Sequence, residues 1–323
     1  MKKQILKVIR LTELGRKIER IIRWILGKEI PIDYKFPKLI SIELSSQCNL
    51  KCIHCPSHRE GDKDEGRRKF GSMSYDVFNN VMNEIDNHGV RTIALHKDGE
   101  PLLNKEIISI LDRVKKNVNH KVYLSTNGLL LNEEICNAIV RNKIDQINIS
   151  IGAASDELYK KIRGGDLSKV KKNIDMLLFY IKSSNVGSIV SVQIIDIEDI
   201  DMKDEIIQFK KSWEEKEVQI DVWKELTWGN KVSNEKKIKR YPCLALWNSF
   251  TINHDGKVSA CCMDWNQSLV IGEYGAQSIS EIWQSQTIKN YRLSHIKNDF
   301  KTMPLCVKCN YWLWHLQLLK YKP

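Results

Sequence analysis

"CNLKCIHC", residues 48–55, places three cysteines and one histidine within eight positions. It follows "LISIEL" (39–44), a short apolar and β-branched run that is typical of a buried strand. Thiols this close together need an explanation, because the rest of the chain has an ordinary globular composition. The chain has nine cysteines, an odd and unevenly clustered set, so we expect a metal or redox centre rather than disulfides.

The composition indicates a globular protein with a sizeable core. The chain has 323 residues, of which 42% are hydrophobic and 28% charged, which suits one large domain with or without a smaller one. No run approaches the roughly twenty apolar residues of a spanning helix. The N-terminus also lacks an apolar stretch followed by a small-residue cleavage site. We therefore expect a cytoplasmic protein.

The positive charge is concentrated at the N-terminus. Of the net charge of +11, residues 1–29 carry +6, from nine Lys or Arg and three Glu. Isoleucine and leucine recur there at three- and four-residue steps, which predicts a basic amphipathic helix within residues 1–37. Such a helix can pack on the protein or make peripheral membrane contact through residues 1–30. We expect no nucleic-acid partner, because no aromatic-rich basic groove accompanies it.

Residues 38–227 alternate between strand and helix patterns. The helix over 73–89 is expected to begin at Ser74 and end at Gly89. This alternation predicts an α/β fold with a parallel sheet and right-handed crossovers, more consistent with a partial barrel than with a complete eightfold one. The cysteine triplet follows the first strand, where such folds carry their chemistry. Strands are predicted at 39–44, 91–96, 121–126, 145–151, 188–194 and 217–223, and the other helices at 104–117, 132–142, 155–182 and 202–215.

Residues 228–323 lack this alternation and predict a second, smaller domain. "SFTINHDGKVSACC" (249–262) is typical of a β-hairpin with its turn at Asp255 and Gly256. The polar stretch 228–240 is the predicted linker. Four more cysteines and a tryptophan-rich tail accompany the hairpin, so this part also has the composition of a metal-binding domain.

The spacing of the first cysteines favours iron–sulfur over zinc. A structural zinc ion takes four ligands, whereas C-x3-C-x2-C supplies three from one loop. His54 could be the fourth only if the loop folded it back. In a cubane iron–sulfur cluster, three thiolates leave one iron without a protein ligand, and an open metal position is typical of catalytic sites.

This triplet after the first strand resembles the radical S-adenosylmethionine (SAM) enzymes, whose fold is a partial (β/α)6 barrel. The resemblance implies that Cys48, Cys52 and Cys55 hold a [4Fe–4S] cluster whose fourth iron binds SAM. One electron from the cluster would then cleave SAM to a 5′-deoxyadenosyl radical, which removes hydrogen from the substrate. The barrel would exclude water and position the C–H bond.

Further motifs resemble the SAM-binding parts of the family. "KDGEPLL" (97–103) is similar to its Gly-Gly-Glu-Pro motif, with Asp98 in place of the first glycine. Arg163 is similar to the arginine that pairs with the SAM carboxylate, although a solvated arginine at a helix end is the alternative. The SAM contacts implied by the resemblance are Gly99, Glu100, Ser125, Asn127, Ser150 and Arg163.

The C-terminal cysteines resemble the SPASM/twitch extension of the family, in the short form of 2-deoxy-scyllo-inosamine dehydrogenase-like enzymes. The resemblance implies a second, auxiliary [4Fe–4S] cluster; a zinc ribbon is the alternative. Four protein thiolates would leave no iron free for substrate, so this cluster would accept an electron, which favours oxidation. The implied ligands are Cys243, Cys261, Cys306 and Cys309.

These features together predict a radical SAM oxidoreductase acting on an alcohol carbon of a sugar or cyclitol, with a flavodoxin- or ferredoxin-type reductant. A peptide substrate is less favoured, because 37 residues before the barrel are too few for a leader-peptide-binding domain.

Cys262 could instead return hydrogen to the substrate, which would make the protein an epimerase. Cys136 is expected in the core. A non-enzymatic iron–sulfur or zinc carrier is a third class. Candidate bases are His96, Lys97, Glu225 and Asp264.

Overall fold

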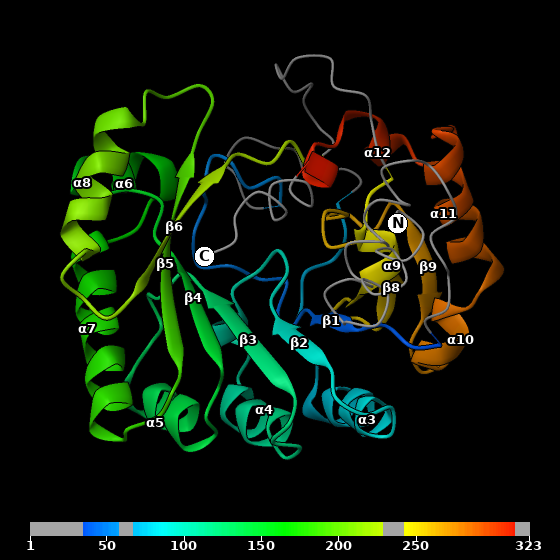
Figure 1. Cartoon of the computed structure of the whole chain (residues 1–323), viewed down its shortest axis with the longest axis horizontal. Helices are drawn as coiled ribbons and strands as arrows, with labels where there is room; N and C mark the ends of the chain where they lie inside the picture. The colour runs from blue at the N-terminus through cyan, green and yellow to red at the C-terminus, as the bar shows by residue number, and fades with distance from the viewer. Residues whose placement is uncertain (1–34, 58–66, 229–241, 314–323) are drawn as a thin grey trace, which may run out of the picture.

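The computed structural model describes residues 35–57, 67–228 and 242–313. The predicted N-terminal helix and almost all of the predicted linker lie outside these ranges. In the described residues nine strands form one sheet, in the order β6-β5-β4-β3-β2-β1-β7-β8-β9. The sheet is strongly curved, and the helices that follow its strands lie on its outer face (Figure 1).

The first six strands confirm the predicted partial barrel, because each pairs in parallel with its neighbour. Their side chains alternate between the two faces. In β3, for example, Val122 and Leu124 are fully buried on the helix side, whereas Tyr123 and Ser125 lie on the inner face. The strands are β1 (Leu39–Ile42), β2 (Thr92–Leu95), β3 (Lys121–Thr126), β4 (Gln146–Ser150), β5 (Ile189–Asp196) and β6 (Gln219–Lys224).

The helices of the barrel follow the predicted order, with two corrections. Ser74 caps α3 as predicted, since its side chain accepts the N–H of Val77. The predicted end at Gly89 was wrong: α3 ends at Asp86, and Gly89 has a φ of 78° in the following turn. The helices are α3 (Tyr75–Asp86), η1 (Pro101–Leu103), α4 (Ile107–Val114), α5 (Glu133–Arg141), α6 (Asp156–Arg163), α7 (Leu167–Ser183) and α8 (Lys203–Trp213).

The second correction concerns the helix predicted over 155–182, which is two helices, α6 and α7. Gly164 ends α6 in the left-handed conformation, with a φ of 76°, and its N–H bonds to the carbonyl of Lys160. A left-handed glycine after the last turn is a common helix end. The chain then restarts at Asp166, whose side chain caps α7. The break places the end of α6 beside the cysteine loop.

The C-terminal part extends the barrel sheet instead of forming a separate one. The predicted hairpin is confirmed: β7 and β8 pair antiparallel around Gly256, whose φ is 84°. In addition, β7 pairs in parallel with β1, with Leu39 opposite Ser249. The predicted division into 38–227 and 228–323 therefore stays a prediction. The remaining elements are α9 (Ala245–Asn248), β7 (Ser249–Ile252), β8 (Lys257–Ser259), β9 (Val270–Glu273), α10 (Ile279–Trp283), α11 (Gln286–Lys297) and α12 (Pro304–Lys308).

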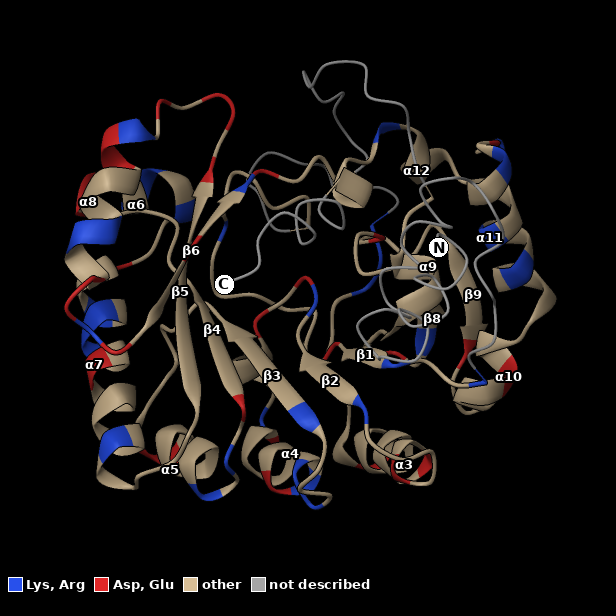
Figure 2. Cartoon of the chain, in the orientation of Figure 1, with Lys and Arg blue, Asp and Glu red and all other residues tan. Residues whose placement is uncertain are grey.

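Charged residues lie mainly on the helices and connecting loops, and the strands carry few (Figure 2). Among the residues that the structure describes, no helix is both long and apolar enough to cross a bilayer. Cys136 is fully buried on α5 within the core, as predicted.

Candidate active site

The loop that carries the cysteine triplet lies against the end of α6. The N–H groups of Lys51 and Ile53 donate to the carbonyls of Arg163 and Ile162, at 3.4 and 3.0 Å. These carbonyls belong to the last turn of α6, which has no further helical N–H to bond. The turn at Gly164 therefore provides the acceptors that hold the cysteine loop in place.

The three thiols of this loop differ in exposure. Cys52 is buried, Cys48 and Cys55 are partly exposed, and none of the three forms a disulfide. The N–H of Cys55 donates to the carbonyl of Cys52 at 3.0 Å, so the loop makes a tight turn between these two residues. Burial raises the pKa of the Cys48 thiol to about 11.

Arg163 lies beside the triplet instead of being solvated at a helix end. Its Nη1 is 3.7 Å from the Sγ of Cys52, and its Nη2 donates to the Oγ of Ser150 at 2.7 Å. Gly152 makes room for it: a Cβ there would lie 2.6 Å from the Nε of Arg163. The structure thus brings together two predicted SAM contacts and one predicted cluster ligand.

Gly99 and Glu100 pack against the cysteine loop from the other side. The N–H of Glu100 donates to the carbonyl of Gln47 at 2.8 Å. The Glu100 carboxylate accepts from Thr126 Oγ1, Asn127 N and Leu102 N, at 2.6, 2.7 and 3.1 Å. Burial raises its pKa. Glu100 therefore ties β2, β3 and the cysteine loop together, which leaves about one of its four lone-pair directions for a SAM ammonium.

Asn127 and Ser125 at the end of β3 also make contacts within the protein. The Asn127 amide donates to the Oδ1 of Asn49 in the cysteine loop, at 2.7 Å. Ser125 Oγ accepts from the Asn148 amide on β4 at 3.3 Å. Asn127 lies at the cysteine loop, whereas Ser125 lies on the inner face; their contacts with SAM stay predictions.

We expect that replacing Gly99 with alanine displaces the cysteine loop. An added Cβ would lie 2.2 Å from the carbonyl oxygen of Ser45 and 2.6 Å from that of Gln47, and backbone atoms cannot move aside cheaply. The free energy of unfolding should fall by about 3 kcal/mol, with loss of N-terminal iron. Denaturant unfolding and iron analysis measure both. Gly187→Ala is the control, since no atom lies within 4 Å of its Cβ position. If both variants lost the same unfolding free energy and the same iron, the packing argument would be contradicted.

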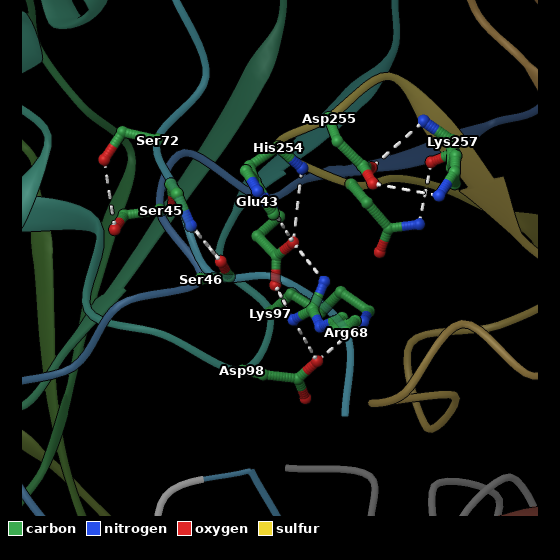
Figure 3. A network of polar contacts seen from close by, with 12 residues as sticks. Glu43, Ser45, Ser46, Arg68, Ser72, Lys97, Asp98, His254, Asp255 and Lys257 are labelled. Atoms are coloured by element: carbon green, nitrogen blue, oxygen red, sulfur yellow. Dashed lines mark hydrogen bonds and ion pairs between the residues drawn. The ribbon is translucent and has the colours of Figure 1, made fainter. Parts of the chain in front are cut away.

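A buried ionic network joins the ends of β1 and β2 to the C-terminal hairpin (Figure 3). Glu43 accepts both Arg68 Nη atoms, at 2.5 and 2.7 Å, and the ring of His254 lies 3.3 Å from it. Asp98 accepts from Arg68 at 3.0 Å and from Lys97 at 2.6 Å. Despite burial, its hydrogen bonds with His254 and Arg68 hold the pKa of Glu43 well below its usual range. Asp98, the departure from the family motif, is thus held by two cations.

Breaking this network should destabilise the protein strongly. Arg68→Met should lower the free energy of unfolding by about 3 kcal/mol, because it leaves Glu43 buried without its bidentate partner. The double variant with Glu43→Gln should recover part of the loss. Denaturant unfolding of each variant measures these changes. Lys121→Met is the control: its ion pair with Asp145 is largely exposed, so we expect little change. A similar loss of unfolding free energy in Arg68→Met and Lys121→Met would contradict the prediction.

Two of the four candidate bases, Lys97 and Asp264, make hydrogen bonds within the protein. Lys97 Nζ donates to Asp98 and, at 3.0 Å, to the carbonyl of Asp264. The Asp264 carboxylate caps its own turn by accepting from Ser268 and from the N–H of Leu269. Both groups therefore have structural roles, and neither is placed as an available base.

His96 and Glu225 are the other two candidate bases. His96 follows β2, and within the described residues its ring makes no hydrogen bond or ion pair. Surrounding protein lowers its pKa, so the imidazole is neutral near pH 7 and can accept a proton. Glu225 follows β6, where its carboxylate accepts from the N–H of Glu198 at 3.2 Å.

A cavity of about 310 Å³ separates the cysteine loop from the ends of β5 and β6. His54 and Ile53 line it on one side, and Glu225, Leu226 and Trp228 on the other. Burial lowers the pKa of His54 to about 3, so its ring is neutral. The cavity thus offers planar rings and apolar side chains directly beside the triplet. From the sequence, His54 was a candidate only as a zinc ligand.

The four C-terminal thiols predicted as auxiliary ligands line one cavity. Cys261 follows β8, and Cys243 precedes α9. Cys306 lies on α12. Cys309 caps the C-terminal end of that helix, where its N–H donates to the carbonyl of Cys306. Burial raises the pKa of Cys243 and Cys261. Segments up to 66 residues apart in the sequence are thus gathered around one space, which suits a cluster held by protein alone.

Cys262 is a neighbour of this group: its thiol helps to raise the pKa of Cys261. It does not line the four-thiol cavity, and its side chain is hydrogen-bonded to Tyr311. Cys261 and Cys262 begin a turn after β8, which the N–H of Asp264 closes by donating to the carbonyl of Cys261 at 3.2 Å. Burial raises the pKa of Cys262 to about 11.

Both thiol sets suit clusters better than single ions. Within residues 35–57, 67–228 and 242–313, no three Cys, His, Asp or Glu side chains converge tightly enough to share one metal ion. In a cubane each thiolate binds a different iron, so its ligands need not converge on one point. Three thiols with a guanidinium fit an incompletely ligated cluster, and four thiols fit a complete one.

A partial parallel barrel with three thiols after its first strand and four more in a C-terminal extension defines an iron–sulfur enzyme of radical SAM type. Residues 42–205 match the family model of the radical SAM superfamily, and residues 243–310 match SPASM, an iron–sulfur cluster-binding domain. The chain therefore belongs to the radical SAM superfamily and carries a SPASM domain. Its cofactors are SAM and two iron–sulfur clusters.

Curated relatives match about half of the chain. The probable GTP 3′,8-cyclase of Methanococcus vannielii is 33% identical over 138 residues, which are 43% of this chain and 44% of the relative. That of Methanocaldococcus jannaschii is 31% identical over 166 residues, covering 50% and 53%. This chain thus spans about half the length of the curated relatives it matches.

Solved structures match over most of the chain. BtrN in complex with AdoMet and 2-DOIA has a TM-score of 0.56 at 19% identity, covering 84% of this chain and 92% of that one. Native anSMEcpe with bound AdoMet has a TM-score of 0.59 at 17% identity, covering 85% and 86%. Streptococcus suis SuiB bound to S-adenosylmethionine has a TM-score of 0.63 at 14% identity, covering 89% and 75%. At these identities the likeness shows the fold.

Proposed function

We propose that this radical SAM enzyme oxidises an alcohol carbon of a sugar or cyclitol. The observation that carries the proposal is the cavity lined by Cys243, Cys261, Cys306 and Cys309. Four protein thiolates complete the coordination of a cubane, so the auxiliary cluster can take an electron but cannot hold substrate. Loss of a hydrogen atom, a proton and an electron converts an alcohol to a ketone. A flavodoxin- or ferredoxin-type reductant is part of the proposal.

When bound, SAM and the N-terminal cluster supply the radical that removes a hydrogen atom from the substrate carbon. We assign that cluster to Cys48, Cys52 and Cys55, with Arg163 holding the sulfur of Cys52. Gly99 lets the loop after β2 approach the cysteine loop closely. We assign the hydroxyl proton to the neutral imidazole of His96, because among the described residues it is the one of the four candidate bases whose side chain makes no hydrogen bond or ion pair.

Two related functions differ from this one in substrate or outcome. SuiB has been solved bound to the precursor peptide SuiA, and anSMEcpe with peptides, so a peptide substrate is an alternative. An epimerase is favoured by one observation: Cys262 lies outside the four-thiol cavity and bonds to Tyr311. A thiol that does not bind a cluster is available to return a hydrogen atom to a substrate radical.

The proposal is tested with the full chain, reconstituted anaerobically with iron and sulfide and reduced with dithionite. We expect 5′-deoxyadenosine from SAM. With a panel of carbon-deuterated sugars and cyclitols that includes 2-DOIA, we expect deuterium in 5′-deoxyadenosine and a product lighter by two hydrogen atoms. Turnover of peptides alone would contradict the substrate class, and recovery of zinc without an iron–sulfur signal would contradict the enzyme.

Cys262→Ala separates oxidation from epimerisation. If the protein is a dehydrogenase, the variant should retain turnover within about threefold, because Cys262 then neither binds the cluster nor donates hydrogen. Product mass and incorporation of solvent deuterium into the substrate carbon are the measurements. Cys136→Ala is the control for loss of a buried thiol elsewhere. Solvent deuterium in the wild-type product, lost in Cys262→Ala, would show an epimerase.

A further inference from the structure

Helix α11 carries two buried, nitrogen-rich side chains: His295 lines the four-thiol cavity, and Arg292 binds the carbonyl of Leu246, which also lines it. Arg292 and His295 are three residues apart, so they lie on the same face of the helix. Both are buried, with 2% and 3% of their surface exposed. The sequence assigned neither of them a role, because nothing in a single helix pattern shows what its buried face meets.

His295 is held in a defined orientation at the four-thiol cavity, which it lines. Its Nδ1 accepts the N–H of Cys243 at 3.2 Å, so a neutral ring carries its proton on Nε2. Phe300 packs edge-on against the ring, with centroids 4.9 Å apart. The imidazole is therefore a fixed N–H donor, and its accepting nitrogen is already used by the backbone of one predicted ligand.

Arg292 is a buried cation whose contacts with the described residues are all with neutral groups. Its Nε and Nη1 donate to the carbonyls of Leu246 and Trp283, at 2.8 and 3.4 Å, and its guanidinium lies 4.2 Å from the Trp283 ring centroid. Among the described residues it has no carboxylate partner. Burial lowers its pKa to about 10, so it stays charged at neutral pH.

A buried charge without a counter-charge is costly, so a source of negative charge is expected nearby. Leu246, whose carbonyl binds Arg292, itself lines the four-thiol cavity. A cluster with four thiolates carries a net negative charge, which increases by one on reduction. A cluster bound in that cavity would supply negative charge to this region, and a nearby cation would favour its reduced form.

We propose that Arg292 and His295 are positioning residues for the auxiliary cluster, and that they raise its reduction potential by charge and by hydrogen bonding. This inference rests on the proposed auxiliary cluster, and it gives that cluster the property an electron acceptor needs. Cluster potentials respond to nearby charge and to hydrogen bonds at the sulfurs.

The test is a redox titration of both clusters, followed by EPR, in the anaerobically reconstituted full chain without substrate. Arg292→Met should lower the auxiliary potential so that its reduction equilibrium changes about tenfold, or about 59 mV for one electron. Arg292→Lys should stay near wild type. The N-terminal cluster is the internal control and should not move. An unchanged auxiliary potential in Arg292→Met overturns the proposal.

A measurement on the wild-type protein covers the case in which Arg292→Met fails to fold. With ¹⁵N-labelled histidine, pulsed EPR of the reduced auxiliary cluster should show a weak nitrogen coupling that disappears in His295→Leu. A strong coupling would identify His295 as a ligand, and no coupling would remove it from the cluster; either overturns its assigned role. Because no substrate is used, these results do not depend on whether the enzyme oxidises or epimerises. Absence of any second iron–sulfur signal would instead refute the auxiliary cluster itself.

Discussion

Cys52→Ala should abolish SAM cleavage, with at least about a thousandfold less 5′-deoxyadenosine than wild type. Cys52 is the buried member of the triplet and the one whose sulfur contacts Arg163, 3.7 Å away. Two remaining thiols on one loop cannot hold a cubane that already has one iron without protein ligand. The iron content should fall by about four atoms per chain.

The measurement combines iron analysis, EPR after dithionite reduction and quantification of 5′-deoxyadenosine. Cys136→Ala is the matched control, because Cys136 is also buried in the barrel but belongs to the core of α5. It should keep the iron and the cleavage activity. Full SAM cleavage in Cys52→Ala would show that the cluster is held by other residues.

Much of the barrel could be predicted from the sequence because its signals are local. Alternating strand and helix patterns fix the order of the elements, and parallel strands bring their carboxyl ends to one edge. The position of the triplet after the first strand follows from that order. The helix break at Gly164 and Gly165 also has a local signal, a glycine pair, but the apolar period on either side concealed it.

The contacts around the site could not be predicted, because they join residues distant in the sequence. Arg68 meets Glu43 and Asp98 only because residues 68–73 lie alongside residues 43–46, where the N–H of Met73 donates to the carbonyl of Leu44. The shared sheet has the same origin: the hairpin signal at 249–262 is local, but the pairing of β7 with β1 is not. Glu100 was predicted to face SAM, and its three protein donors come from residues 102, 126 and 127.

Cys309→Ala should separate the two halves of the proposed chemistry. Cys309 is one of the four thiols around the auxiliary cavity, and its sulfur accepts the N–H of Tyr311 at 3.4 Å. Without it the auxiliary cluster should be lost, with about four iron atoms per chain. The barrel and its triplet are unaffected, so uncoupled cleavage of SAM should stay within about threefold of wild type.

The same samples decide between electron transfer and a purely structural role for the C-terminal cluster. Iron analysis and EPR report the loss of one signal and the retention of the other, and 5′-deoxyadenosine reports the N-terminal half alone. Cys262→Ala is the control, since Cys262 lies next to the proposed ligand Cys261 but does not line the cavity, and it should keep both signals. If Cys309→Ala kept the auxiliary signal, the four-thiol assignment would be wrong. If it oxidised substrate as wild type does, the electron would have to leave by another route, because the ketyl radical cannot become a ketone without an acceptor.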